Sequence, residues 1–188
     1  MNKVVDIYLP LDSRETANRE VWPVAVRQTV ELVRVIKKCG WRANVLNPDR
    51  PVASVAEGMR VIERSKGQRL INFMAGWAYP DFSVSPMAQL PADLPKLLLG
   101  SAIRDFPGSV GLFAAASGTA HMGIETDRLF VERFEDHKEY SAALDAFLNR
   151  GSYCPPYPKG IEVKVGETHR KKAKRIREML RGSIYGAV

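Results

Sequence analysis

The segment Val4-Val5-Asp6-Ile7-Tyr8-Leu9 indicates the fold class, because the chain up to about residue 150 repeats the strand and helix pattern that it begins. It is a short run rich in β-branched residues that ends at Pro10, as is typical of a buried strand. After a polar stretch, apolar residues recur at helical spacing from Trp22 to Ile36. This helix is expected to stop at Cys39-Gly40, with the glycine in the C-cap position.

The alternation of strand and helix continues along the chain. Further strands are expected at residues 41–46, 70–75, 95–100 and 127–131, and further helices at residues 52–65, 107–123 and 136–149. Such alternation implies a parallel sheet that is covered on both faces. We therefore predict an α/β fold with three layers, a flavodoxin-like (Rossmann-like) parallel sheet of strand order 2-1-3-4-5 with helices on both faces.

The pattern breaks near residue 150, which predicts two parts. Residues 1–150 form the α/β domain, and residues 151–188 form a linker, a basic helix and the start of a second domain. Residues 151–166 are rich in Gly and Pro, as linkers are. The last seven residues, 182–188, resemble a β-strand, which either pairs with an edge of this sheet or opens a further domain.

The positive charge is concentrated in the basic helix. The chain has 188 residues and a formal net charge of +7. Residues 167–181 hold seven Lys or Arg against two Glu, a net +5, which leaves +2 for the rest. Because the body of the protein is nearly neutral, the pattern disfavours nucleic-acid binding.

Composition also excludes several classes of protein. No run of 18 apolar residues exists and the N-terminus has no apolar signal segment, which argues against membrane insertion and secretion. The two cysteines, Cys39 and Cys154, form no CxxC pair, so a disulfide scaffold or a cysteine zinc site is not expected. The three histidines, His121, His137 and His169, show no metal-binding spacing. We expect a cytoplasmic protein with no metal centre made by this chain alone.

Two polar loops are expected to meet at the strand-order reversal, where open α/β sheets bind ligands. The first, residues 10–19, follows the first strand and contains Arg14 and Arg19. The second, residues 75–82, places Trp77, Tyr79 and Asp81 within a few positions. A tryptophan beside charged side chains is suited to a sugar, because the ring stacks on its apolar face while the charged groups hydrogen-bond its hydroxyls.

Simpler interpretations of these residues remain open. Arg14 and Arg19 are equally well explained as solvated charges around a helix N-terminus. Trp77 is equally well explained as a core or interface anchor, and Asp12 as a turn or cap residue.

Four motifs in register resemble one family. They are Asp12-Ser13-Arg14 with Arg19-Glu20, then residues 76–80 (Gly-Trp-Ala-Tyr-Pro), then Lys96-Leu97-Leu98-Leu99, and then residues 107–116 through Gly123-Ile124. Over roughly residues 5–150 the chain resembles the N-terminal domain of the L-fucose isomerase and L-arabinose isomerase superfamily of aldose–ketose isomerases. The resemblance implies that Arg14 and Trp77 contact a sugar substrate. Tyr79 and Asp81, from the second loop, complete the expected substrate-binding pocket.

The resemblance also implies what lies outside this chain. In the family, a divalent metal, usually manganese, is held by Glu, Asp and His residues of later domains, and the first domain helps to close the pocket of a neighbouring subunit in a homo-oligomer. We therefore expect a substrate-recognition and oligomer-assembly domain that does not isomerise a sugar alone. A fragment, a truncated product and half of a split enzyme are all compatible with the sequence.

Two other classes of function compete with this hypothesis. A flavodoxin-like module could hold a small molecule or a phosphate at the same edge, although the first loop contains no glycine to cradle it. The basic helix could instead dock on an acidic protein surface or on nucleic acid, in which case binding would weaken steeply with salt.

Overall fold

The computed structural model describes residues 3–102, 108–153 and 166–181. The chain divides into two compact units, Met1–Pro155 and Pro156–Val188. The expected strand at residues 182–188 and most of the expected linker at residues 151–166 lie outside the described residues.

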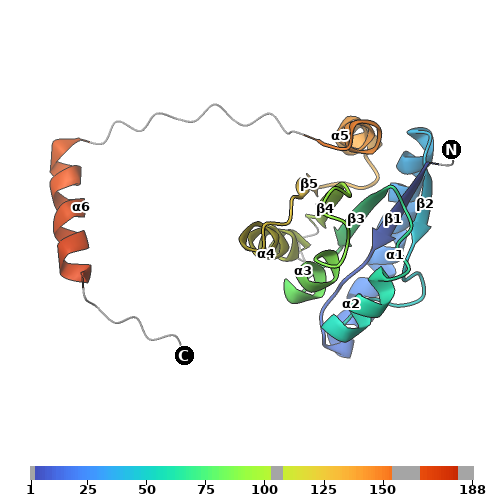
Figure 1. Ribbon diagram of the computed structural model, residues 1–188, viewed down its shortest axis with the longest axis horizontal. Helices are drawn as coiled ribbons and strands as arrows, with labels where there is room; N and C mark the ends of the chain where they lie inside the picture. Colours follow the sequence, from blue (N-terminus) through green and yellow to red (C-terminus); the bar gives the residue numbers. More distant parts are fainter. Residues whose placement is uncertain (1–2, 103–107, 154–165, 182–188) are drawn as a thin grey trace. The chain divides into compact units, whose positions relative to one another are not determined.

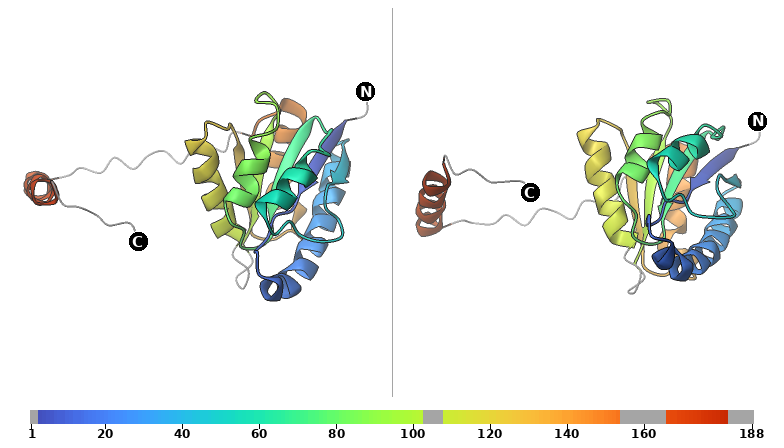
Figure 2. Two further views of the ribbon diagram at one scale, coloured as in Figure 1. Left: turned by 60° about the horizontal axis from the view of Figure 1, so that its bottom comes forward. Right: turned by 90° about the horizontal axis from the view of Figure 1, so that it is seen from below.

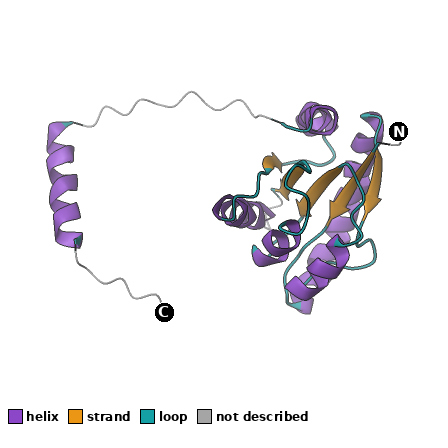
Figure 3. Cartoon of the chain, in the orientation of Figure 1, coloured by secondary structure: helices purple, strands orange, loops and turns teal. Residues whose placement is uncertain are grey.

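The first unit is built on a parallel sheet of five described strands (Figure 3). The strands are β1 (Val4–Tyr8), β2 (Arg42–Val45), β3 (Arg69–Met74), β4 (Lys96–Ser101) and β5 (Asp127–Val131). Their order is β2-β1-β3-β4-β5, and every neighbouring pair is parallel. The predicted flavodoxin-like topology is confirmed.

Helices cover both faces of this sheet (Figures 1 and 2). The helices of the first unit are α1 (Glu15–Lys38), α2 (Val55–Ile62), α3 (Asp81–Met87), α4 (Gly108–His121) and α5 (His137–Arg150). Helices α1 and α5 pack together on one face, whereas α2, α3 and α4 pack side by side on the other. The sheet therefore lies between two helical layers.

Two apolar cores result, because successive side chains of a strand point to opposite faces. In β1, Ile7 belongs to the core under α1 and α5, and Tyr8 belongs to the core under α2, α3 and α4. Both side chains are fully buried. The buried Tyr8 hydroxyl donates a hydrogen bond of 2.5 Å to the carbonyl of Phe82, which ties α3 to the sheet.

Two helices differ from the sequence prediction. Helix α1 begins at Glu15, seven residues before Trp22, and continues through Pro23. Its first turns are largely exposed, so they carry no apolar stripe that would mark them as helical. Helix α3 was not predicted, because a seven-residue helix containing Pro86 has too few turns to show a period.

Helix α4 packs unusually close to the sheet. A Cβ atom on Gly108 would lie 2.3 Å from the Met74 carbonyl oxygen, and one on Gly100 would lie 2.8 Å from Cβ of Leu112. Farther along the helix, a Cβ on Gly118 would lie 2.7 Å from Val84 of α3. Glycine is thus required where α4 meets β3, β4 and α3.

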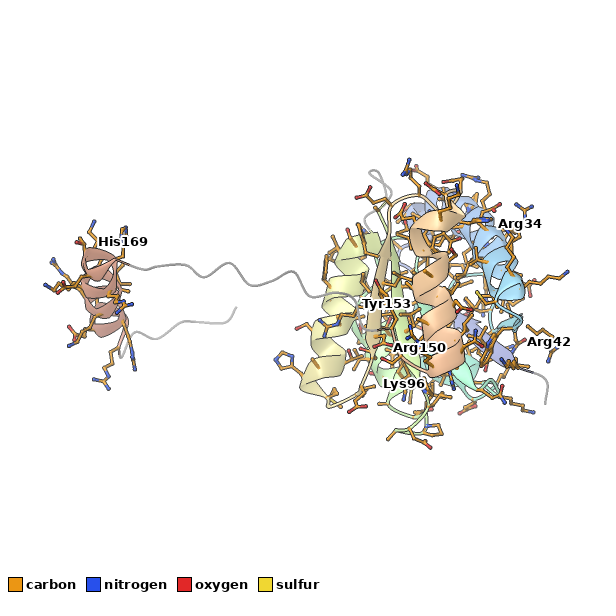
Figure 4. The ribbon with its side chains drawn as sticks, turned by 90° about the horizontal axis from the view of Figure 1, so that it is seen from above. Arg34, Arg42, Lys96, Arg150, Tyr153 and His169 are labelled. Atoms are coloured by element: carbon orange, nitrogen blue, oxygen red, sulfur yellow. The ribbon has the colours of Figure 1, made fainter. Side chains whose placement is uncertain are left out.

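Lys96, at the start of β4, is a buried cation that the fold satisfies locally (Figure 4). Its ammonium group donates to the carbonyls of Pro91 and Leu94 at 2.8 Å each and to that of Ala92 at 3.3 Å. Burial lowers the pKa of this lysine. All three of its protons are therefore used to close the turn before β4.

The second unit contains one described helix, α6 (Glu167–Leu180). Its described side chains are exposed, and Lys171 forms an ion pair of 3.0 Å with Glu167. Among the helices in the described part of the chain, none is both long and apolar enough to cross a membrane.

The close packing of α4 makes a stability prediction. Gly108→Ala is expected to lower the free energy of unfolding by about 1–3 kcal/mol, because the new methyl group would overlap the backbone of β3 and β4. Ser117→Ala, on the exposed face of the same helix, is the matched control and should change stability little. Urea denaturation of the three chains measures both effects. A stabilised Gly108→Ala chain would show that helix propensity outweighs the steric overlap.

Candidate functional site

The loop after β1 is tied to the loop after β2, which places it at the carboxyl edge of the sheet. Leu9 exchanges two hydrogen bonds with the side chain of Asn47, at 3.1 and 3.0 Å. The backbone N–H of Leu11 donates to the carbonyl of Val52 at 2.9 Å, and that of Val52 donates to Leu9 at 3.0 Å. This edge is where parallel sheets present ligand-binding residues.

Asp12, which follows directly, is buried and holds Arg14. Its carboxylate accepts hydrogen bonds from the Arg14 backbone N–H at 2.9 Å and from Nε and Nη2 at 3.0 and 2.5 Å. The Asp12 side chain is 4% exposed, whereas that of Arg14 is 69% exposed. A buried carboxylate therefore fixes the direction in which an exposed guanidinium points.

The electrostatics of the pair follow from this geometry. The hydrogen bonds from Arg14 lower the pKa of Asp12, although burial of the carboxyl acts in the opposite direction. Reciprocally, Asp12 raises the pKa of Arg14, with a smaller contribution from Tyr79. The interaction with Tyr79 indicates that the second loop lies within electrostatic range of Arg14.

The second loop, residues 75–82, is fixed by close contacts of its backbone with α1, β4 and α4. A Cβ on Gly76 would lie 2.7 Å from Cγ1 of Val21 on α1, and one on Gly111 of α4 would lie 3.2 Å from the Gly76 carbonyl oxygen. In addition, the Ser101 hydroxyl donates to the Ala75 carbonyl at 3.2 Å. These contacts fix the backbone from which the aromatic residues of the loop project.

Trp77 and Tyr79 of this loop form an exposed aromatic pair. Trp77 is 37% exposed and Tyr79 is 39% exposed. Their rings meet edge to face with centroids 6.1 Å apart, and the Tyr79 ring lies 5.4 Å from that of Phe82. Trp77 thus keeps an accessible surface, as a stacking platform requires.

The structure brings three of the four predicted site residues together. Tyr79 contacts Trp77, and Arg14 lies close enough to Tyr79 for the pKa of Arg14 to be raised slightly. Asp81 is exposed in the first turn of α3, where its charge favours the helix N-terminus. Within the described residues, no hydrogen bond or ion pair joins Asp81 to the other three. Their role in binding a substrate stays a prediction.

The interpretation of Asp12 as a turn residue is confirmed, because its carboxylate accepts from the backbone N–H of Arg14. Its role as the anchor of the Arg14 guanidinium was not predicted. The signal was the Asp-Ser-Arg order itself, since an aspartate two residues before an arginine can bond both its backbone and its side chain. Asn18 of α1 adds a further restraint, because its Nδ2 donates to the Asp12 carbonyl at 2.7 Å.

The aromatic pair and Arg14 lie on an open surface and not in a pocket. Five surface hollows of the described residues, between about 290 and 710 Å³, contain neither Arg14 nor Trp77 in their linings. Arg14 and the aromatic pair therefore resemble one wall of a site more than an enclosed pocket.

The described residues do not fit a resident metal ion. No three His, Cys, Asp or Glu side chains gather anywhere among residues 3–102, 108–153 and 166–181. His121 Nδ1 lies 2.8 Å from the Ser117 carbonyl oxygen of its own helix. His137 Nε2 lies 2.9 Å from Oε2 of Glu31 and packs against Tyr140. No chemical step is assigned to a metal in this chain.

Comparison with known proteins decides the family. The family model described as L-fucose isomerase, first N-terminal domain, matches residues 3–147. The chain belongs to this family. The match spans the whole sheet with α1 to α4 and most of α5, which confirms the resemblance found in the sequence motifs. No curated protein matches the chain.

The anchored arginine of this L-fucose isomerase-type domain makes a pH-dependent prediction. Asp12→Asn should lower the free energy of unfolding near neutral pH, because an amide cannot accept both side-chain bonds of the guanidinium as a carboxylate does. The native pKa of Asp12 lies below the usual 3.8, so the stabilisation is full above that pH and is lost as pH falls through the native pKa.

Urea denaturation of both chains near neutral pH and at about pH 2.5 measures this difference. The gap between the two chains should narrow at the acidic pH. A gap of the same size at both values would mean that the charge of Asp12 is not its source.

Proposed function

We propose that this chain is the N-terminal substrate-recognition and oligomer-assembly domain of an L-fucose isomerase-like aldose–ketose sugar isomerase in the cytoplasm. The observation that carries the proposal is the guanidinium of Arg14, which buried Asp12 fixes on the loop after β1, next to the strand β3 whose following loop exposes Trp77 and Tyr79. Membership of the L-fucose isomerase first N-terminal domain family supports it.

Each side chain then has a defined role toward a sugar. The Trp77 indole stacks on the apolar C–H face of the substrate, where a 6-deoxy sugar also presents its methyl group. Arg14 donates hydrogen bonds to hydroxyl oxygens through the guanidinium N–H groups that face solvent. Tyr79 supports the indole edge, and Asp81 accepts from a hydroxyl that reaches α3.

The reaction itself requires groups beyond this wall. Aldose–ketose isomerisation moves a proton between neighbouring carbons through an enediol, which needs a paired acid and base and an electrophile on the carbonyl oxygen. We place these groups, with manganese or another divalent metal, in other domains of the complete enzyme. This chain then supplies orientation and closure of the pocket.

The first test of the proposal uses the indole N–H signals of the three tryptophans in a ¹H–¹⁵N correlation spectrum. Titration of the chain with L-fucitol, the alditol of L-fucose, should shift the Trp77 signal. Trp41 is the internal control, because it is 7% exposed and its Nε1 already donates to Asn149 at 3.0 Å. One wall of a site predicts weak, millimolar affinity, on the order of 1 mM or weaker.

Arg14→Gln should weaken this response at least about tenfold. Arg19→Gln is the matched control, since Arg19 is also exposed but pairs with Glu15 at 2.8 Å on the outside of α1. An equal response in the Arg14 variant would remove Arg14 from the site. If inorganic phosphate shifts Trp77 and L-fucitol does not, the flavodoxin-like phosphate module is the better hypothesis.

A second test concerns catalysis. The chain incubated with L-fucose and Mn²⁺ should form no ketose, because the proposed site holds no base and acid pair on opposite sides of a substrate. Detection of the ketose by ¹³C NMR measures this directly. Metal-dependent turnover by the purified chain would contradict the assignment of the chemistry to other domains.

A further inference from the structure

The β5 edge of the sheet is open among the described residues. β5 pairs with β4 on one side and with no described strand on the other (Figure 1). The Val131 carbonyl accepts from Ala102 on the β4 side at 3.0 Å. Backbone groups of a parallel strand alternate between its two neighbours, so those of Arg128 and Phe130 point to the open side. Unpaired strand edges of this kind are templates for association.

An apolar surface borders this edge. Phe130 is 41% exposed, whereas its neighbours Leu129 and Val131 are buried on the opposite face under α5. Phe130 is level with Gly100, which meets Leu112 of α4. On α4, Phe113 is 63% exposed and Val110 is 40% exposed. The exposed side of α4 thus carries these two apolar side chains as well as the polar Ser117 and His121.

The charges beside Phe130 are arranged for a two-fold axis. Exposed Arg128 precedes Phe130 by two residues, and exposed Glu132 follows it by two, directly after β5. Arg128 and Phe130 share one side of β5 by alternation, and Glu132 follows at the same spacing in the bend after the strand. If two β5 strands pair antiparallel about Phe130, each Arg128 lies opposite the Glu132 of the other copy, and the two Phe130 rings meet.

We propose that a second copy of this chain docks on the β5 edge, antiparallel and centred on Phe130, so that two five-stranded sheets form one continuous sheet. The contact is isologous, because each residue of the surface meets the same surface in the partner. This inference rests on the assembly role in the proposed function and names the surface that performs it.

The helices set the size of the contact. The two β4 strands would lie three strand spacings apart, about 14 Å, with the two α4 helices above them. Directly packed helices lie only 8–10 Å apart, so side chains must fill the remaining gap. The exposed side chains of Phe113 and Phe130 from both copies would supply this apolar volume.

Helix α5 limits the length of the new pairing. The Glu139 carboxylate accepts from the backbone N–H groups of Glu132 at 2.5 Å and Arg133 at 3.2 Å. These donors are not free for a partner strand. The ladder is therefore short and centred on Phe130, and the flanking ion pairs and aromatic rings determine its register.

A charge swap tests this register. Sedimentation of the wild-type chain should show a dimer at about 100 µM. Arg128→Glu, which sets two carboxylates opposite each other, should raise the dissociation constant at least about tenfold. Combining Arg128→Glu with Glu132→Arg restores opposite charges and should restore the dimer. Val30→Lys, on the competing apolar surface of α1 where Val30 is 45% exposed, should leave the dimer intact.

The remaining outcomes overturn the proposal in distinguishable ways. A dimer that is insensitive to Arg128→Glu, that the double variant fails to restore, or that Val30→Lys disrupts shows that assembly uses another surface. A chain that remains monomeric overturns both this edge and assembly by this domain. Sugar recognition is measured separately by the Trp77 signal and does not depend on either result.

Discussion

The structure depends on the close approach of α4 to the sheet. Gly108 and Gly111 on the helix, together with Gly100 on β4, remove the side-chain layer that would otherwise separate helix from strand. As a result, the backbone of α4 is in direct contact with the carbonyl end of β3 and with the loop that follows it. Because this loop carries Trp77 and Tyr79, the same packing that closes one core also positions the candidate site. A core contact and the candidate binding surface thus share one geometric constraint.

The two halves of the site are made rigid by different physical means. The aromatic half is fixed sterically, through contacts of the loop backbone with Val21 and Gly111. The arginine half is fixed electrostatically, through the buried carboxylate of Asp12. Long exposed side chains lose conformational entropy when they bind a ligand. Restricting Arg14 before a substrate arrives reduces that cost, which is the advantage of placing a carboxylate under an exposed cation.

Much of the fold could be predicted from the sequence, because buried faces of strands and helices require apolar residues at regular spacing. The five strands and the parallel order follow from apolar runs such as Val4–Tyr8, which alternate with helical stripes. The start of α1 and the whole of α3 could not be predicted, since exposed turns and a seven-residue helix show no periodic apolar pattern. Arg14 and Trp77 could be proposed from residue type and loop position. The anchoring by Asp12 depends on burial, which only the folded chain defines.

The two edges of the sheet differ in how well each one can pair with a copy of itself. The β2 edge is a strand of four residues with exposed Arg42 and Asn44. Pairing β2 with its own copy about Asn44 would set Arg42 opposite Leu46, and pairing about Ala43 would set Arg42 opposite Asn44. Neither arrangement compensates the arginine charge, and a short edge with a charged side chain resists self-pairing. At β5 the opposite holds, because Arg128 and Glu132 are equidistant from Phe130. Of these two edges, the β5 edge is therefore the one that is complementary to itself in charge and in apolar surface, and this asymmetry would direct the proposed assembly to one side of the sheet.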